Sequence, residues 1–215
     1  MRKTSIHNHK RTTASIMVAV LAMCLCGGCS KEEDSAVPAF KMDLVEADTD
    51  HEGKVSIIRL DNGTTYNVDQ EISTETSDTT YRCMCTYAVD EHQKLHVYGL
   101  NHIFSPQPRP KNSFKSVAYD PVDLTSCWKS GGYLNLRIGL RTTDNGAHRF
   151  GFCEDSVVMQ GGYQKVYFTL LHGRSEEDAE SYTENVFMSI PLSQYACDSV
   201  CLRVQTYEGW REVVR

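Results

Sequence analysis

Residues 55–68 read Val-Ser-Ile-Ile-Arg-Leu-Asp-Asn-Gly-Thr-Thr-Tyr-Asn-Val, and this stretch indicates the fold class of the chain. Two runs rich in β-branched and aromatic residues flank the dipeptide Asn62-Gly63. Both central positions of a tight hairpin turn need a positive φ, which asparagine and glycine adopt most readily. The stretch therefore predicts a β-hairpin with strands at 55–60 and 64–68.

More β-rich runs lie on the C-terminal side of this hairpin, at 79–89 and 95–104. Four short strands with polar turns between them favour a small barrel, so we expect an OB-like β-barrel domain over residues 51–105. Three prolines then interrupt the pattern, because proline lacks a backbone donor and restricts the chain. Residues 106–112 are therefore predicted to be a proline-rich linker.

The second half of the chain also consists of short β runs separated by turn residues. We expect its strands at 133–142, 147–153, 165–171, 185–190, 200–207 and 210–214. Strands at this spacing, without an apolar period of helical length, are typical of a sandwich. The sequence thus predicts an all-β protein with an immunoglobulin-like β-sandwich at residues 113–215.

The first 28 residues have the three parts of an export signal. Basic residues stand at positions 2, 3, 10 and 11 without any acid, and an apolar run of eleven residues extends from Ile16 to Cys26. That run is too short for a membrane span, which needs about 20 residues. Gly27-Gly28-Cys29 then resembles a lipobox, although Cys26 stands where leucine is usual. Residues 1–28 are predicted to be a lipoprotein signal peptide, and Cys29 the lipidated anchor.

Residues 29–50 are polar and acidic, so we expect a flexible tether. The run Lys-Glu-Glu-Asp at 31–34 resembles the acidic stretch that directs many Bacteroidetes lipoproteins to the outer face of the outer membrane. The alternative is a tether that is merely solvated. The expected location is the outer membrane, with the protein exposed at the surface. Ser35 follows Asp34 and matches a short Bacteroidetes O-glycosylation pattern.

The charge of the exported part limits its partners. The leader holds four of the 22 basic residues and none of the 28 acidic ones, so residues 29–215 carry a net charge of −10. Nucleic acids are bound largely through Lys and Arg that neutralise phosphates. The sequence therefore argues against a nucleic-acid partner. The expected partners are the membrane, through the lipid anchor, and an unidentified protein or glycan.

Six cysteines remain beyond the anchor, and an oxidising compartment would permit disulfides between them. Six thiols allow fifteen complete pairings, so the sequence leaves both disulfides and buried free thiols open. Their spacing does not match a zinc knuckle, and neither a metal nor a cofactor is expected. These cysteines are Cys83, Cys85, Cys127, Cys153, Cys197 and Cys201.

Three features of the second half resemble one known family. They are the stretch 128–136 (Trp-Lys-Ser-Gly-Gly-Tyr-Leu-Asn-Leu), His148 ahead of an aromatic strand, and the strand 166–172. Together with the leader and the order of domains, they resemble the NigD-like lipoproteins of Bacteroidetes. That resemblance implies an N-terminal OB-type domain and a C-terminal β-sandwich. It implies no catalytic residue.

The function predicted from the sequence is a non-enzymatic, membrane-anchored binding module of the cell envelope. One alternative is bacteriocin immunity, which rests on the family name alone. Another is a hydrolase that uses His172 with a carboxylate from residues 176–180. The chain lacks a glycine-flanked nucleophilic serine and a glycine-rich phosphate loop, so no reaction class is specified and no catalytic residue is predicted.

Overall fold

The computed structural model describes residues 39–144, 146–175 and 182–215, and these residues form an almost entirely β structure. Its one named helical element is the short 3₁₀ helix η2 (Lys111–Ser113). Within the described part of the chain, no helix is long and apolar enough to cross a membrane. The prediction of an all-β protein is confirmed.

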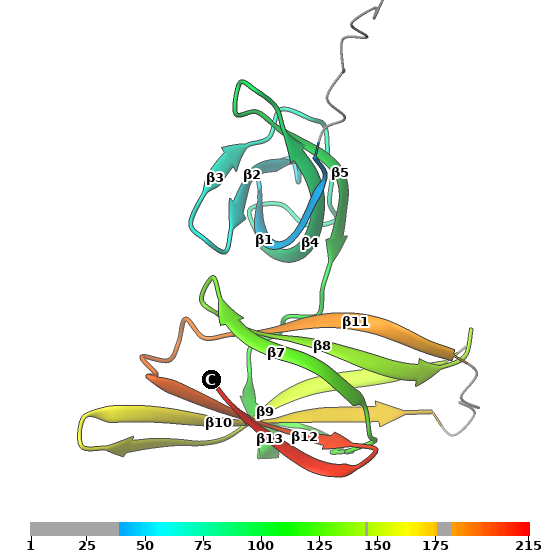
Figure 1. Cartoon of the computed structure of the whole chain (residues 1–215), viewed down its shortest axis with the longest axis vertical. Coiled ribbons are helices and arrows are strands. Elements are labelled where there is room, and N and C mark those ends of the chain that lie inside the picture. The colour runs from blue at the N-terminus through cyan, green and yellow to red at the C-terminus, as the bar shows by residue number, and fades with distance from the viewer. Residues whose placement is uncertain (1–38, 145, 176–181) are drawn as a thin grey trace, which may run out of the picture. The chain divides into compact units, whose positions relative to one another are not determined.

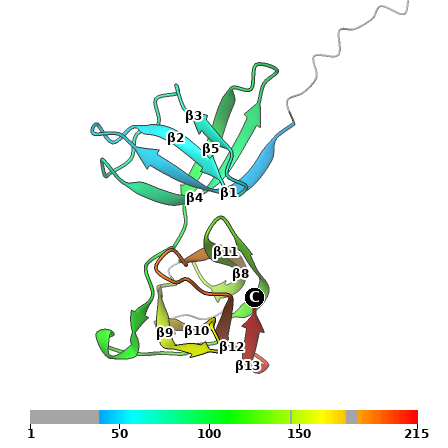
Figure 2. The same ribbon diagram turned by 90° about the vertical axis from the view of Figure 1, so that its left-hand side faces the viewer.

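The N-terminal domain is one antiparallel sheet of five strands that curls into an open barrel (Figure 1, Figure 2). Its spatial order is β3-β2-β1-β4-β5, which is the strand order of an OB-type barrel whose β3 and β5 edges face each other. The strands are β1 (Lys41–Thr49), β2 (Val55–Leu60), β3 (Thr65–Asn67), β4 (Thr80–Val89) and β5 (Leu95–His102). The hairpin predicted from residues 55–68 is present as β2 and β3. Gly63 has a φ of +88°, but Asn62 does not have a positive φ, so the expectation of a positive φ at both turn positions is wrong.

A glutamine side chain bridges the gap between the two edges of this sheet. The Gln70 amide nitrogen donates to the Val97 carbonyl at 3.1 Å, and the Val97 N–H donates to the Gln70 amide oxygen at 2.7 Å. Nearby, the Lys94 ammonium lies 2.5 Å from an Asp69 carboxylate oxygen. The Gln70 amide therefore satisfies backbone groups of β5 that a paired strand would satisfy in a closed barrel.

The prediction of a flexible tether over residues 29–50 is wrong for residues 41–49, which form the central strand β1. Leu44, Val45 and Ala47 are buried in this strand. The acids between them made the segment look polar, but Asp48 and Glu46 are both paired with Arg59. Pairing of these charges lets a sequence of tether-like composition occupy the middle of a sheet.

The C-terminal domain is a β-sandwich of two sheets. One sheet has the order β13-β12-β10-β9-β6 and the other β11-β8-β7. β10 and β12 are parallel neighbours, whereas β9–β10, β12–β13, β7–β8 and β8–β11 are antiparallel. The strands are β6 (Arg109–Pro110), β7 (Asp123–Ser130), β8 (Tyr133–Thr142), β9 (His148–Gln160), β10 (Tyr163–Arg174), β11 (Tyr182–Pro191), β12 (Ser199–Thr206) and β13 (Gly209–Val214).

Two segments of this domain differ from the sequence prediction. Residues 109–110 of the predicted linker form β6, which pairs in parallel with Cys153 and Glu154 of β9. Proline is tolerated there because β6 lies at the edge of its sheet. β7 was not predicted as a strand, since its burial alternates irregularly around a bulge between Leu124 and Ser126.

Each domain has its own apolar core. In the sandwich, Phe152, Phe168 and Leu202 are at most 1% exposed. In the barrel, Ile58, Tyr87 and Leu95 are buried to the same degree. Burying one such side chain contributes roughly 1.5–3 kcal/mol to the free energy of unfolding, so each core stabilises its own domain.

Candidate functional site

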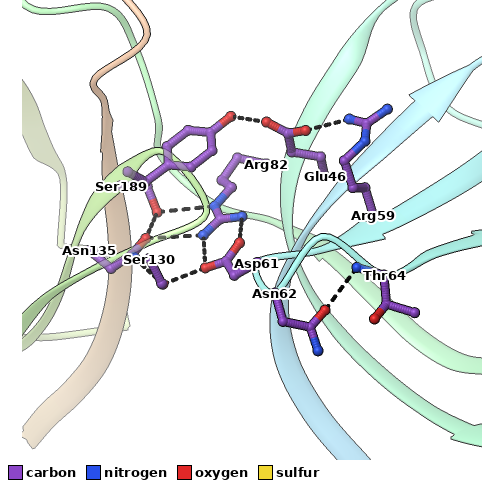
Figure 3. A network of polar contacts seen from close by, with 10 residues as sticks. Glu46, Arg59, Asp61, Asn62, Thr64, Arg82, Ser130, Asn135 and Ser189 are labelled. Carbon is purple, nitrogen blue, oxygen red and sulfur yellow. Dashed lines mark hydrogen bonds and ion pairs between the residues drawn. The ribbon is translucent and has the colours of Figure 1, made fainter. Parts of the chain in front are cut away.

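A buried arginine, Arg82 of β4, lies where the barrel meets the sandwich. Its side chain is 2% exposed. Its two terminal nitrogens donate hydrogen bonds to the two carboxylate oxygens of Asp61, at 2.5 and 2.7 Å (Figure 3). Parallel bonds of this kind match the planar guanidinium to a carboxylate and offset much of the cost of burying the cation. Asp61 directly follows β2, so the predicted hairpin turn supplies this acid.

The sandwich completes the hydrogen bonding around this pair. Arg82 also donates to Asn135 Oδ1 at 3.1 Å and to Ser189 Oγ at 3.4 Å, and both of these residues are 0% exposed. The Ser189 hydroxyl donates to Asn135 Oδ1 at 2.6 Å. Asn135 Nδ2 donates to Ser130 Oγ at 2.9 Å, and the Ser130 hydroxyl donates to Asp61 at 2.5 Å. These five residues, which we call the Arg82 joint, satisfy one another's polar groups.

Tyr133 covers the joint and links it to a second charged cluster. The Arg82 guanidinium carbon lies 4.1 Å from the centre of the Tyr133 ring, a cation–π distance. The Tyr133 hydroxyl donates to Glu46 at 2.7 Å, and Arg59 donates to the other oxygen of Glu46 (Figure 3). Burial, followed by the Glu46 hydrogen bond, raises the pKa of the Tyr133 hydroxyl. The hydrogen bond to Glu46 raises the pKa of Arg59, so both groups keep their protons.

Gly131 allows Asp61 to approach the turn between β7 and β8. Its φ is +59°, and a Cβ added at this position would lie 2.2 Å from an Asp61 carboxylate oxygen. A side chain is therefore excluded by both backbone conformation and space. Ser130, Gly131 and Asn135 all belong to the stretch 128–136 that carries the family resemblance. In this structure, side chains of that stretch form hydrogen bonds with Arg82 and Asp61.

A groove of about 670 Å³ opens beside the Arg82 joint. Tyr66, Trp128 and Phe187 contribute half-buried aromatic rings to it. Polar side chains from both domains lie among these rings. The lining consists of Lys41, Met42, Asp43, Leu44, Leu60, Asp61, Asn62, Thr64, Tyr66, Met84, Tyr87, Trp128, Ser130 and Phe187.

The two carboxylates that line this groove are both engaged in hydrogen bonds. Asp61 is held by Arg82 and Ser130, and Asp43 accepts a hydrogen bond from the Tyr87 hydroxyl at 2.8 Å. Burial, followed by the Asp43 hydrogen bond, raises the pKa of Tyr87. The lining contains neither histidine nor cysteine, the usual partners of an activated nucleophile. Across the described residues, no cluster of three or more His, Cys, Asp or Glu is placed to hold a metal ion.

The structure places His172, the proposed base of the hydrolase alternative, in a packed site of the sandwich. His172 is 2% exposed, and its Nδ1 lies 2.9 Å from the Asp120 carbonyl oxygen. Its Nε2 lies 2.9 Å from Nδ1 of His148, whose ring stacks on it. Burial lowers the pKa of His172. Both ring nitrogens are engaged, and the carboxylates at 176–180 lie outside the described residues.

The six cysteines of the two domains are free thiols in this structure, and all except Cys197 are buried. Cys83 and Cys85 lie in the barrel core, where burial raises their pKa values to about 11 and about 12. A thiol with so high a pKa is a poor nucleophile and a poor metal ligand at neutral pH. The predicted lipidation site Cys29 and glycosylation site Ser35 lie outside the described residues.

Sequence reasoning did not identify Arg82 or the groove. The only signal for Arg82 is a charge inside an apolar strand, between Tyr81 and Cys83, and such a residue commonly faces solvent in an antiparallel sheet. The groove combines residues from six strands and a turn, several of them distant in the sequence. Its lining residues between 60 and 66 were noticed only as part of the predicted hairpin, and Trp128 and Ser130 only as part of the family-like stretch.

Comparison with solved structures shows the same fold in proteins from Bacteroides species. A NigD-like immunity protein from Bacteroides caccae matches with a TM-score of 0.61 and 24% identity, over 83% of this chain and 92% of that chain. A candidate lipoprotein from Bacteroides fragilis matches with a TM-score of 0.57 and 14% identity, over 83% of this chain and 97% of that one. A protein of unknown function from Bacteroides vulgatus matches with a TM-score of 0.61 and 12% identity, over 81% and 90% of the two chains.

The family comparison identifies the second half of the chain directly. The search of curated proteins found no match. The model of the NigD-like C-terminal beta sandwich domain matches residues 105–214, which are just over half of the chain. This range starts before β6, in agreement with the pairing of β6 into the sandwich sheet. The resemblance inferred from the stretch 128–136, His148 and the strand 166–172 is confirmed: the chain belongs to the NigD-like family.

Proposed function

We propose that this NigD-like protein is an exported lipoprotein, anchored through Cys29, that binds a neutral oligosaccharide at the cell envelope without chemical conversion. The basic start, the short apolar run and the small residues before Cys29 support export and lipidation. The Bacteroides fragilis structural relative, a candidate lipoprotein, is consistent with this proposal. The acidic run at 31–34 supports display on the outer membrane.

The groove beside the Arg82 joint is the observation that carries the binding proposal. Its volume of about 670 Å³ lies within the range of ligand pockets, roughly 300–1,000 Å³. Tyr66 and Trp128 offer amphipathic ring faces, while Asn62 and Thr64 offer hydrogen-bonding groups. OB-type barrels also bind oligosaccharides with their strand faces and loops. The net charge of −10 disfavours an anionic ligand.

Glycan-array screening followed by calorimetry tests this proposal on residues 30–215. We expect Trp128→Ala to weaken binding of a retained glycan at least tenfold, because it removes one ring from the groove. Trp210→Ala is the matched control, since this second tryptophan is 43% exposed on β13 and does not line the groove. Retention of no glycan, or equal loss in both variants, would contradict the proposal.

The anchor is tested separately by metabolic labelling with palmitate in the native host. Cys29→Ala should abolish labelling, whereas Cys26→Ala should retain it, because only Cys29 directly follows the small pair Gly27-Gly28. Labelling of the Cys29→Ala variant would be incompatible with the assigned anchor.

Bacteriocin immunity is a second candidate function. It is favoured by the Bacteroides caccae relative, a NigD-like immunity protein that aligns over 92% of its length. Deletion of the gene should then raise sensitivity to toxins from neighbouring strains. Unchanged sensitivity across a panel of such strains would eliminate this candidate.

A further inference from the structure

The hairpin of β9 and β10 extends past the strands beside it and leaves one edge of β9 open. β6 pairs with β9 only at Cys153 and Glu154, and β12 pairs with β10 from Lys165 onward. Within the described part of the chain, no strand pairs with the outer edge of residues 155–160. Figure 1 shows this hairpin running beyond the ends of the neighbouring strands.

Apolar side chains are exposed on both faces of this extension. Val157 and Met159 point to one face, at 40% and 65% exposure, and Val158 and Tyr163 lie on the other, at 43% and 51%. Residues 156–164 carry no charge in a protein that is otherwise strongly acidic. Natural edge strands are usually protected by charges, prolines or bulges. Residues 156–160 contain no charge or proline, and the bulge of the β9–β10 ladder lies next to them, at Asp155.

The turn of the hairpin determines which backbone groups face outward. Gly161 and Gly162 have φ values of +61° and +82°, which identify a two-residue turn of the primed kind, closed by Gln160 and Tyr163. Alternate residues of an antiparallel pair direct their N–H and C=O groups to the partner strand. Counting back from Gln160, Val157 and Met159 direct theirs to the open edge.

We propose that this edge pairs with the same edge of a second copy of the chain, antiparallel and centred on Val158. In that register Val157 of each copy lies opposite Met159 of the other, and their outward N–H and C=O groups form the ladder. The ladder spans residues 156–160 of each copy, which carry no charge, so no like charges are opposed. Met159 of one copy would then lie beside Val157 of the other copy, whose β10 neighbour Val166 is buried. The three side chains would form one continuous row on the same face of the sheet.

A second copy fits this edge better than a foreign strand because the uncharged stretch is complementary to itself. Elsewhere the two acidic molecules would repel each other. The contact is independent of the groove, so it does not depend on the proposed glycan. Only a short ladder joins the copies, and we therefore expect a weak dimer that forms at high protein concentration.

Disulfide trapping tests both the contact and its register on residues 30–215. Two Val158 residues at the centre of the ladder would have Cα atoms about 4.5 Å apart, within the range of a disulfide bond. Val158→Cys should therefore form a covalent dimer under mild oxidation. Val157→Cys is similarly exposed, but the two cysteines at position 157 would lie two residues apart along the ladder. This variant should form at least fivefold less covalent dimer.

Sedimentation velocity supplies the independent measurement. The wild-type chain should double in mass as its concentration rises, and Val158→Lys should remain monomeric because two like charges would face each other. Circular dichroism confirms that each variant is folded. A wild-type chain that is monomeric at every concentration, or equal trapping of the Val157→Cys and Val158→Cys variants, would overturn the proposal.

Discussion

Replacing Arg82 by methionine should strongly destabilise the protein, because it leaves Asp61 without its cation. The Arg82 side chain is 2% exposed and the Asp61 side chain 18% exposed, so water can replace little of the interaction that Asp61 loses. Removing one partner of a buried ion pair costs about 3–5 kcal/mol. Since Asp61 keeps some contact with water and its Ser130 hydrogen bond, we expect about 3 kcal/mol.

Urea unfolding measures this loss. With a slope of about 2 kcal/mol per molar urea, the midpoint should fall by about 1.5 M. Both tryptophans, Trp128 and Trp210, are in the sandwich, so their fluorescence reports that domain while far-UV circular dichroism reports both. Because Arg82 forms hydrogen bonds to both domains, the fluorescence and circular dichroism transitions of the variant should have different midpoints.

A matched variant and a second substitution sharpen the test. Arg59→Met removes an arginine of the same sheet whose side chain is 41% exposed, and it should cost less than Arg82→Met, because its partners Glu46 and Asp48 keep 23% and 25% exposure to water. Adding Asp61→Asn to Arg82→Met should recover part of the loss, because it removes the stranded charge. A loss below about 1 kcal/mol for Arg82→Met, or a loss equal to that of Arg59→Met, would refute the reasoning.

Three further predictions concern the turn, a histidine and the thiols. Gly131→Ala should destabilise by more than about 1 kcal/mol in urea titrations, because its Cβ meets Asp61, whereas Gly132→Ala meets no atom within 4 Å and should cost only its backbone strain. Burial lowers the pKa of His172 in the folded state, so its contribution to stability is full above the unfolded pKa of about 6.5 and decreases as the pH falls below that value. His172→Asn should flatten the dependence of the free energy of unfolding on pH in this range, as measured by urea titrations at several pH values. An unchanged dependence would contradict the role of His172. In the native protein, Ellman's reagent should react readily only with Cys197, and the other five thiols of the two domains should react after unfolding; fast native reaction in a Cys197→Ser variant would contradict their burial.

The family-like stretch 128–136 gains a structural explanation from the Arg82 joint. Ser130 and Asn135 bond to the Arg82–Asp61 network, Gly131 makes room for it, and Tyr133 covers it. Trp128, the first residue of the stretch, lies in the adjoining groove. One short segment of the sandwich therefore both receives the barrel and lines the candidate binding site.

The sequence by itself determined the local features of this protein. Gly63 indicated the first hairpin because its positive φ is a local requirement, and alternating β-rich runs indicated an all-β chain. The stretch 128–136, His148 and the strand 166–172, with the leader and the order of domains, indicated the family. β1 escaped notice because its acids are neutralised by Arg59, which is distant in the sequence, so composition alone suggested a tether.

The tertiary structure alone decided which polar residues act together. Arg82 and Asp61 are 21 positions apart, Arg82 and Asn135 are 53 apart, and Arg82 and Ser189 are 107 apart. No periodicity links such positions, because the pairing depends on how two separately patterned domains meet. The same holds for the groove, whose rings come from both domains, and for the open edge of β9, which exists because β6 is only two residues long.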